Sequence, residues 1–166
     1  MNDAVRLLVV DADKDGVGQV RQLIYEAAPA QFDISDVPTL EAAGDCVRRR
    51  EDGYQAVRVA VSLSEDSGFD LLKLFESVSS YPAVIMLTSC EDKELAIRAL
   101  RSGAQDYFLR TRMNGPAIVR SIRFAVERQR VRQLAVAQEL NAIHGAALRT
   151  RNLIKTLGLE AAPDST

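Results

Sequence analysis

The segment VRVAVSLSEDSG, residues 57–68, combines a strand-like apolar run with a loop rich in groups that could do chemistry. The alternating valines predict a buried strand. The loop after it carries hydroxyl and carboxyl groups at Ser62, Ser64, Glu65 and Asp66. In α/β domains, reactive side chains are usually placed at the carboxyl ends of the strands. The last inward-facing position of this strand is nevertheless Ala60, whose methyl group supplies no acid, base or nucleophile.

The elements that would position such residues alternate between strands and helices. Apolar runs predict strands at residues 5–10, 32–35, 56–61, 83–88 and 105–109. Helical spacing and capping signals predict helices over 14–27, from Pro38-Thr39 towards Gly53, after Ser67, over 92–101, and from near Pro116 onward. This succession of β–α units predicts an α/β fold, with a doubly wound parallel sheet and helices on both of its faces.

The last predicted helix is longer than a compact domain needs. No proline follows Pro116 before Leu157, and the only glycine between them is Gly145. Residues at alternating three- and four-residue spacings form the a/d stripe of a heptad repeat. The part of this stripe beyond the domain, called the seam below, comprises Gln133, Val136, Leu140, Ile143, Ala147, Thr150, Ile154 and Leu157. We expect the seam to form a coiled-coil or helical-hairpin dimer. A helix folded back on its own domain, or two helices broken at Gly145, are the alternatives.

Composition narrows the class of protein. The chain has 166 residues, of which 47% are hydrophobic and 27% charged, so one packed domain with an appendage is feasible. It contains no apolar run long enough to span a membrane and no signal-peptide pattern. The net charge of −2 gives no reason to expect a nucleic-acid partner. The spacing of Cys46 and Cys90 indicates neither a disulfide framework nor a zinc motif. We therefore expect a cytoplasmic protein without a membrane partner.

Over about residues 4–128 the chain resembles the receiver domain of bacterial response regulators. Five segments carry the resemblance, in order: LLVVDAD, VAVSLSEDSGFDLL, VIMLTS, ALRSGAQDYFLR and IRFAVERQR. The resemblance implies a flavodoxin-like, five-stranded parallel sheet of order 2-1-3-4-5. The implied organisation is a receiver-like domain at 1–128, a helical or coiled-coil extension at 129–158 and a disordered tail at 159–166.

The resemblance also implies a phosphorylation site, in which an aspartate accepts a phosphoryl group beside an acidic cluster that holds Mg²⁺. A hydroxyl and a lysine would bind the phosphoryl oxygens. Carried over to this sequence, the acceptor position is Ala60, the first acid is Asp11, and the metal-ligating second acid is replaced by Ala12. Asp13 comes one position later, Thr88 keeps the hydroxyl, and Arg110 replaces the lysine. We expect this degenerate site to hold no metal or cofactor, and Asp11 to pair with Arg110.

The favoured interpretation is a non-enzymatic receiver module of two-component (phosphorelay) signal transduction that works independently of phosphorylation. It would act through protein–protein interaction, with a histidine kinase or an output domain as partner, and through dimerisation of its last helix. The resemblance places the partner face on the fourth helix, fifth strand and fifth helix, at Ala99, Tyr107 and Ile122. It also implies that such a helix leads into a further module.

Two other functions remain open at this stage. One is an active phosphoacceptor receiver that uses an unconventional carboxylate, Glu65 or Asp66. The other is a nucleic-acid-binding, antiterminator-like regulator, because arginines are dense at positions 110, 112, 120, 123, 128, 130 and 132. The only histidine, His144, faintly resembles the phosphoaccepting helix of a histidine kinase, but a solvated helix histidine is the favoured interpretation.

Overall fold

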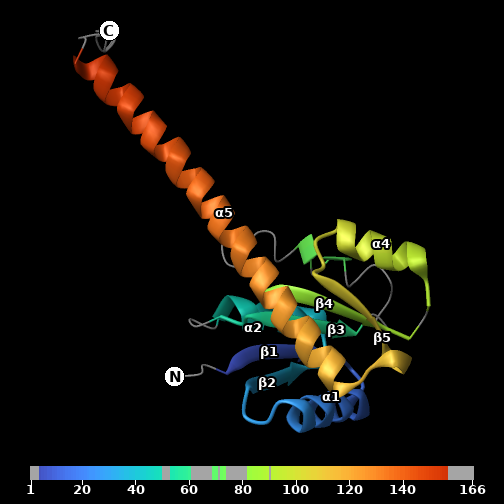
Figure 1. The fold of residues 1–166 in the computed structure, drawn as a ribbon. Helices are drawn as coiled ribbons and strands as arrows, with labels where there is room; N and C mark the ends of the chain where they lie inside the picture. Colours follow the sequence, from blue (N-terminus) through green and yellow to red (C-terminus); the bar gives the residue numbers. More distant parts are fainter. Residues whose placement is uncertain are drawn as a thin grey trace. The chain divides into compact units, whose positions relative to one another are not determined.

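The computed structural model describes residues 4–49, 53–60, 69–70, 72–73, 82–89 and 91–156. In these ranges, strands form one parallel sheet: β1 (Val5–Val10), β2 (Phe32–Val37), β3 (Ala56–Ala60), β4 (Ala83–Thr88) and β5 (Asp106–Leu109). The order across the sheet is β2-β1-β3-β4-β5, with every neighbouring pair parallel (Figure 1). The predicted fold class is therefore confirmed.

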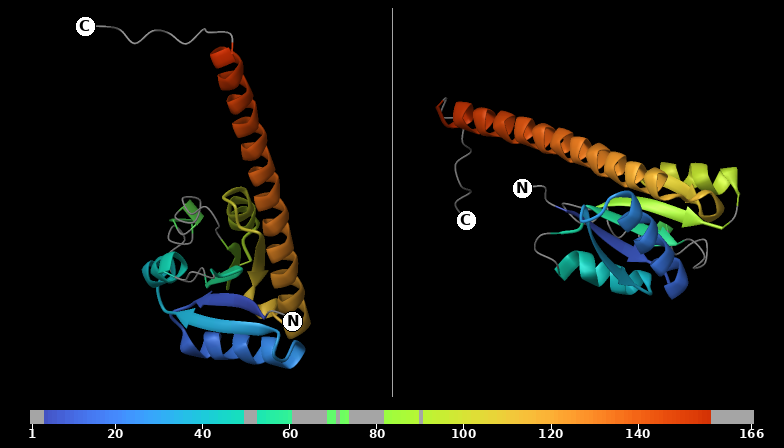
Figure 2. Two further views of the ribbon diagram at one scale, coloured as in Figure 1. Left: turned by 90° about the vertical axis from the view of Figure 1, so that its left-hand side faces the viewer. Right: turned by 60° about the horizontal axis from the view of Figure 1, so that its bottom comes forward.

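Helices cover both faces of the sheet, as Figures 1 and 2 show. They are α1 (Lys14–Ala27), α2 (Leu40–Arg49), α4 (Lys93–Arg101) and α5 (Gly115–Thr156), with a short 3-10 turn, η1 (Arg110–Arg112), before α5. Side chains alternate along β1, so Leu7 and Val9 pack with α1 and the start of α5. Leu8 and Val10 pack with α2 and α4 on the other face.

Local signals explain where the helices begin and end. The carboxylate of Asp13 caps α1 by accepting a hydrogen bond from the backbone N–H of Asp15, and Asp92 caps α4 in the same way. Gly103 follows α4 with a φ of +101°, in the left-handed region that favours glycine. The N–H of Ala104 donates to the carbonyl of Ala99, which completes the C-terminal motif typical of such glycines.

One strand boundary differs from the sequence-based prediction. Strand β2 continues to Val37, because it pairs with β1 in register along its full length. It lies at the edge of the sheet and exposes polar residues, so its apolar pattern is weak. The described part of α2 is Leu40–Arg49, and residues 50–52, between it and the predicted stop at Gly53, lie outside the described residues. The helix predicted after Ser67 lies largely outside the described residues, although Phe69 and Leu72 are described and buried in the core.

Helix α5 is one continuous helix through Gly145. Contacts divide the chain into two compact units, Met1–Gln129 and Arg130–Thr166, and the division falls within α5. In the second unit Val136, Leu140 and Ile143 are exposed by 50–61%. The side chain of Ile154 and all of Leu157 lie outside what the structure describes. None of the described helices combines the length and apolar character that a membrane span needs.

The start of α5 depends on a close approach to α1. A Cβ at Gly115 would lie 2.4 Å from the backbone oxygen of Leu23 and 2.9 Å from the Cβ of Ala27. We expect Gly115→Ala to push the helices apart and lower the free energy of unfolding by about 1–3 kcal/mol in urea denaturation. Gly18→Ala is the control, because Gly18 lies on the exposed side of α1 with no atom within 4 Å. It should raise the same free energy by about 0.5–1 kcal/mol, and equal effects of the two changes would contradict this packing.

Candidate functional site

The carboxyl ends of the strands bring most of the predicted site residues to one edge of the sheet. Asp11 follows β1, Ala60 ends β3, Thr88 ends β4 and Arg110 follows β5. Strands β1, β3 and β4 are neighbours, and their registers pair Val10 with Val59 and Ala60 with Leu87, so these ends lie side by side. Ala60 and Thr88 are buried there, whereas Ala12 is exposed.

Asp11 is the centre of this edge. Its side chain is only 1% exposed, and both carboxylate oxygens are engaged. Oδ1 accepts a hydrogen bond from the backbone N–H of Asp13 at 3.0 Å. Oδ2 accepts one from Nη2 of Arg110, also at 3.0 Å, and lies 3.8 Å from Nη2 of Arg58. The predicted ion pair between Asp11 and Arg110 is therefore present, and it has a third member.

Arg110 also covers the first turn of α1. Its Nη1 lies 3.8 Å from Oδ2 of Asp13, and its side chain is 22% exposed. A Cβ at Gly16 would lie 2.4 Å from the same Nη1. The guanidinium therefore occupies the space that the missing side chain of Gly16 leaves, and it holds the loop between β1 and α1 against the end of β5.

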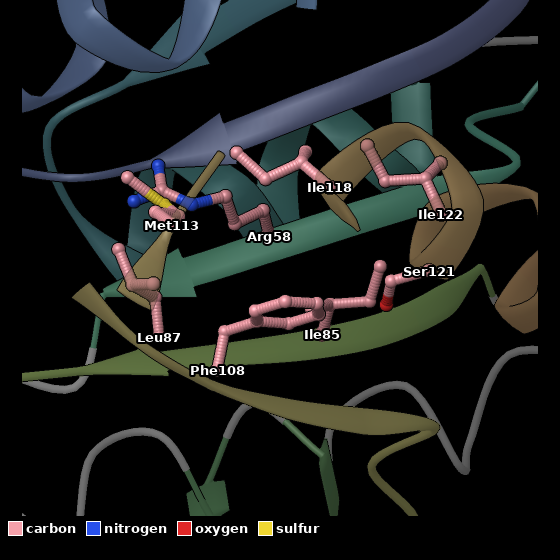
Figure 3. Close-up of a pocket in the computed structure, with 8 residues that line it drawn as sticks. All are labelled: Arg58, Ile85, Leu87, Phe108, Met113, Ile118, Ser121 and Ile122. Carbon is pink, nitrogen blue, oxygen red and sulfur yellow. The ribbon is translucent and has the colours of Figure 1, made fainter. Parts of the chain in front are cut away.

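Arg58 is the functional-site residue that the sequence-based prediction missed. It lies in the middle of β3, where it pairs in register with Val9 and Ile85, and its side chain is 4% exposed. Figure 3 shows this side chain running towards the carboxyl end of β3, with its guanidinium beside Met113. The signal was present in the sequence, because a single charged residue interrupts the apolar run of a central strand.

The surroundings of Arg58 are mostly apolar. It lines a cavity with room for about one water molecule. The other lining residues come from β4, β5 and the start of α5: Ile85, Leu87, Phe108, Met113, Ile118, Ser121 and Ile122. Within the described part of the chain, Nε, Nη1 and Nη2 of Arg58 have no hydrogen-bond partner. Asp11 is thus the anion that its positive charge faces.

Burial weakens the basicity of Arg58. Loss of water lowers the pKa of its guanidinium to about 10, the negative charge of Asp11 opposes this change, and the positive charge of Arg110 adds to it. Because the folded-state pKa lies below the ordinary value, the folded state gives up this proton more easily than the unfolded chain. The guanidinium is therefore charged below pH 10, and the cost of burying that charge is present throughout that range.

Two residues of the predicted partner face do not lie on the surface. Ala99 is buried between α4 and the sheet, and Ile122 is buried between α5 and the opposite face of the sheet. Their side chains point inward because helix positions that contact a sheet form the apolar stripe of the helix. The prediction was therefore wrong for these two side chains. Tyr107 is partly buried, whereas Ile97 and Leu100 on α4 are about half exposed.

Several residues considered in the sequence lie outside the described part of the chain, among them Ser62, Ser64, Glu65, Asp66 and Cys90. Among the residues that are described, no group of three or more histidine, cysteine or acidic side chains could hold a metal ion. The described charged groups that contact Asp11 and Asp13 are the guanidiniums of Arg58 and Arg110.

We expect Asp11→Asn to destabilise the protein strongly, because it removes the anion that Arg58 and Arg110 share. Loss of one partner of a buried ion pair lowers the free energy of unfolding by about 3–5 kcal/mol, which chemical denaturation measures. The matched control is Glu91→Gln, which breaks the exposed 2.7 Å pair between Glu91 and Arg112. That change should cost under about 1 kcal/mol. Similar losses in the two variants would show that the Asp11 cluster is not a buried network.

Comparison with solved structures finds the same fold in receiver domains. A CheY-like receiver from Methanospirillum hungatei is 18% identical with a TM-score of 0.64, and the match covers 78% of this chain and 99% of the other. The signal receiver domain of an HD domain-containing protein from Pseudomonas fluorescens is 21% identical with a TM-score of 0.65, and the match covers 78% of this chain and 92% of the other. A fusion that carries a trimeric coiled coil of yeast Spc42 is 14% identical with a TM-score of 0.66, and the match covers 95% of this chain and 98% of the other.

Comparison with curated protein sequences gives no match. The sequence model of the response regulator receiver domain, in contrast, matches residues 7–123. This range contains the start of α5 and the whole sheet except the first two residues of β1. With the strand order 2-1-3-4-5 and the cluster at the carboxyl ends of the strands, this match shows that the chain belongs to the response regulator receiver domain family.

Proposed function

We propose that this receiver domain is a two-component signalling module that works without phosphorylation and acts through protein–protein contacts. The observation that carries the proposal is the state of Asp11, whose two oxygens are held by a backbone N–H and by guanidiniums. Ala60 ends β3 at the position where the family resemblance places the phosphoacceptor, and a methyl group has no nucleophilic atom. Asp11 is the only fully buried carboxylate among the described residues, and it is already neutralised.

The chemistry of phosphoryl transfer supports the same proposal. A carboxylate that attacks phosphorus needs a free oxygen lone pair and room for the incoming phosphoryl group. Oδ2 of Asp11 faces Arg110 and Arg58, and Oδ1 accepts a hydrogen bond from the backbone N–H of Asp13 in the loop before α1. Asp13 is exposed, and its carboxylate caps α1. Neither side chain is placed as a free nucleophile.

We expect the protein to gain no phosphoryl group from acetyl phosphate and Mg²⁺, because no described carboxylate at these strand ends is available to accept one. Intact-protein mass spectrometry after incubation provides the measurement. A receiver with an acceptor aspartate, treated in the same tube, is the positive control. A phosphorylated product would contradict the proposal, and peptide mapping would then test Glu65, Asp66 and His144 as acceptors.

The second part of the proposal is that the seam of α5 pairs with a second copy of the chain. The second unit reaches at least Thr156, so its helix spans about 40 Å at 1.5 Å per residue. Val136, Leu140 and Ile143 expose half or more of their surface along this helix. Thr150 lies in the same stripe, and its hydroxyl donates to the carbonyl of Ala146, so its polar group is satisfied within its own helix. The similar fusion that carries a trimeric coiled coil makes a trimer the alternative outcome.

We expect Ile143→Asp to weaken self-association at least about tenfold, because it places a charge at a seam position where apolar side chains meet. Sedimentation velocity over a concentration series measures the association. Leu148→Asp is the matched control, since Leu148 is also an exposed apolar residue of α5 but lies one position past Ala147, outside the stripe. Equal weakening by both variants, or a monomeric parent protein, would contradict the proposed use of the seam.

No observation favours the two other functions. Glu65 and Asp66 lie outside the described residues. Among the arginines that suggested nucleic-acid binding, Arg110 pairs with Asp11, Arg112 pairs with Glu91, and Arg128 donates to the carbonyl of Gln105. These three guanidiniums are engaged within the domain rather than presented together as a phosphate-binding surface.

A further inference from the structure

The surroundings of Asp11 do not suit the divalent metal ion that the family resemblance implies. Mg²⁺ prefers six oxygen ligands in octahedral geometry, and proteins usually supply one or two carboxylates together with water. Here Oδ2 accepts a hydrogen bond from Nη2 of Arg110 at 3.0 Å, and the positively charged Nη2 of Arg58 lies 3.8 Å away. Ala12 stands at the position of the second acid and is exposed. Among the described residues, the charged side chains that contact Oδ2 are the guanidiniums of Arg110 and Arg58.

The two arginines differ in what they add. Arg110 stands where the resemblance places a lysine, so a cation at that position is compatible with a metal-binding receiver. Arg58 is the additional cation, and it comes from the strand that ends at Ala60. Positions 58 and 60 lie on the same face of β3, because side chains alternate along a strand. The guanidinium therefore reaches the carboxyl end of β3 from within the core (Figure 3).

The position of Arg58 makes its charge permanent at this edge of the sheet. Its side chain is 4% exposed, and all three of its nitrogens are enclosed without a hydrogen-bond partner among the described residues. It cannot turn out to solvent without opening the contact between β3 and the helices on that face. Arg110 is 22% exposed, so its guanidinium has a path to water. A dication that approached Oδ2 would thus meet a fixed positive charge within a few ångströms.

We infer that Arg58 takes the place of the metal ion in this receiver, as a cation that the chain itself supplies to Asp11. This inference deepens the proposed function, on which it rests, and it names Arg58 as the residue that excludes a divalent metal. It follows that the acids alone do not restore the metal site. Only their restoration together with removal of the Arg58 charge does so.

The test compares variants in which both missing acids are restored. One variant carries Ala12→Asp and Ala60→Asp, and a second carries Arg58→Met in addition. Isothermal titration calorimetry with MgCl₂ measures the affinity directly, after circular dichroism has shown that each variant is folded. We expect the variant with Arg58→Met to bind Mg²⁺ at least about tenfold more tightly than the variant that keeps Arg58.

The matched control adds Arg112→Met to the two restored acids instead of Arg58→Met. Arg112 is exposed and pairs with Glu91, so this change removes one positive charge without touching Asp11. It should leave the weak Mg²⁺ affinity of the doubly restored variant unchanged. Arg58→Gln, which keeps polar atoms but no charge, serves as a second replacement if the methionine variant does not fold.

Two results would overturn the inference. The first is equal Mg²⁺ affinity with and without Arg58, which would show that its charge does not occupy the metal position. The second is the absence of Mg²⁺ binding in both charge-removed variants, which would place the cause of exclusion elsewhere. Failure of the proposed function is separate, because it would appear as phosphorylation of the unaltered protein, which the metal titrations do not use.

Discussion

The buried carboxylate of Asp11 is the constraint on which the described site depends. A charge out of contact with water must be compensated by opposite charge and hydrogen bonds, and this requirement fixes the groups around it. In the sheet, β3 and β4 lie between β1 and β5, so the contact from Arg110 to Asp11 joins residues that follow two well-separated strands. Arg58 approaches the same oxygen from β3. One anion therefore connects three parts of the domain: the loop before α1, the centre of the sheet and the turn after β5.

Two residues beside this cluster are small. Gly16 leaves the space that Nη1 of Arg110 occupies, and Ala60 leaves the carboxyl end of β3 without a second acid. Among the described residues, Asp11 thus contacts arginines, and the two positions at which the family resemblance places further acids, 12 and 60, are alanines. This arrangement lowers the stability of the fold at Arg58, because its enclosed nitrogens lack hydrogen-bond partners among the described residues.

Most of the fold could be predicted from sequence because its signals are local. The bounds of β1, α1 and β4 follow from continuous or periodic apolar runs with clear caps, and the structure places them at the predicted residues. The end of β2 could not be located, because an edge strand with one exposed face carries little hydrophobic pattern. The helix continues through Gly145, since one glycine costs a helix only about 1 kcal/mol and the flanking residues are good helix formers.

The site was only partly predictable, because its pairings are tertiary. The contact of Asp11 with Arg110 could be anticipated from the family resemblance, which places both at the same edge. The role of Arg58 could not, since nothing local says that a strand residue will extend along the core to reach an aspartate on a neighbouring strand. The errors at Ala99 and Ile122 have a similar origin. The resemblance names the elements of a face, but which side of each helix meets solvent depends on how it packs on the sheet.

A site with a fixed internal cation changes how a receiver can carry information. In a phosphorylated receiver, two states arise because the charge at the strand ends changes with modification. Here Arg58 stays positively charged below pH 10, and it lies beside Asp11 together with Arg110. Under the proposed function, the second state must come from association, and the exposed seam of α5 is where the chain offers it. Association follows mass action, so the output of such a module would depend on the concentration of the chain and of its partners rather than on phosphoryl transfer.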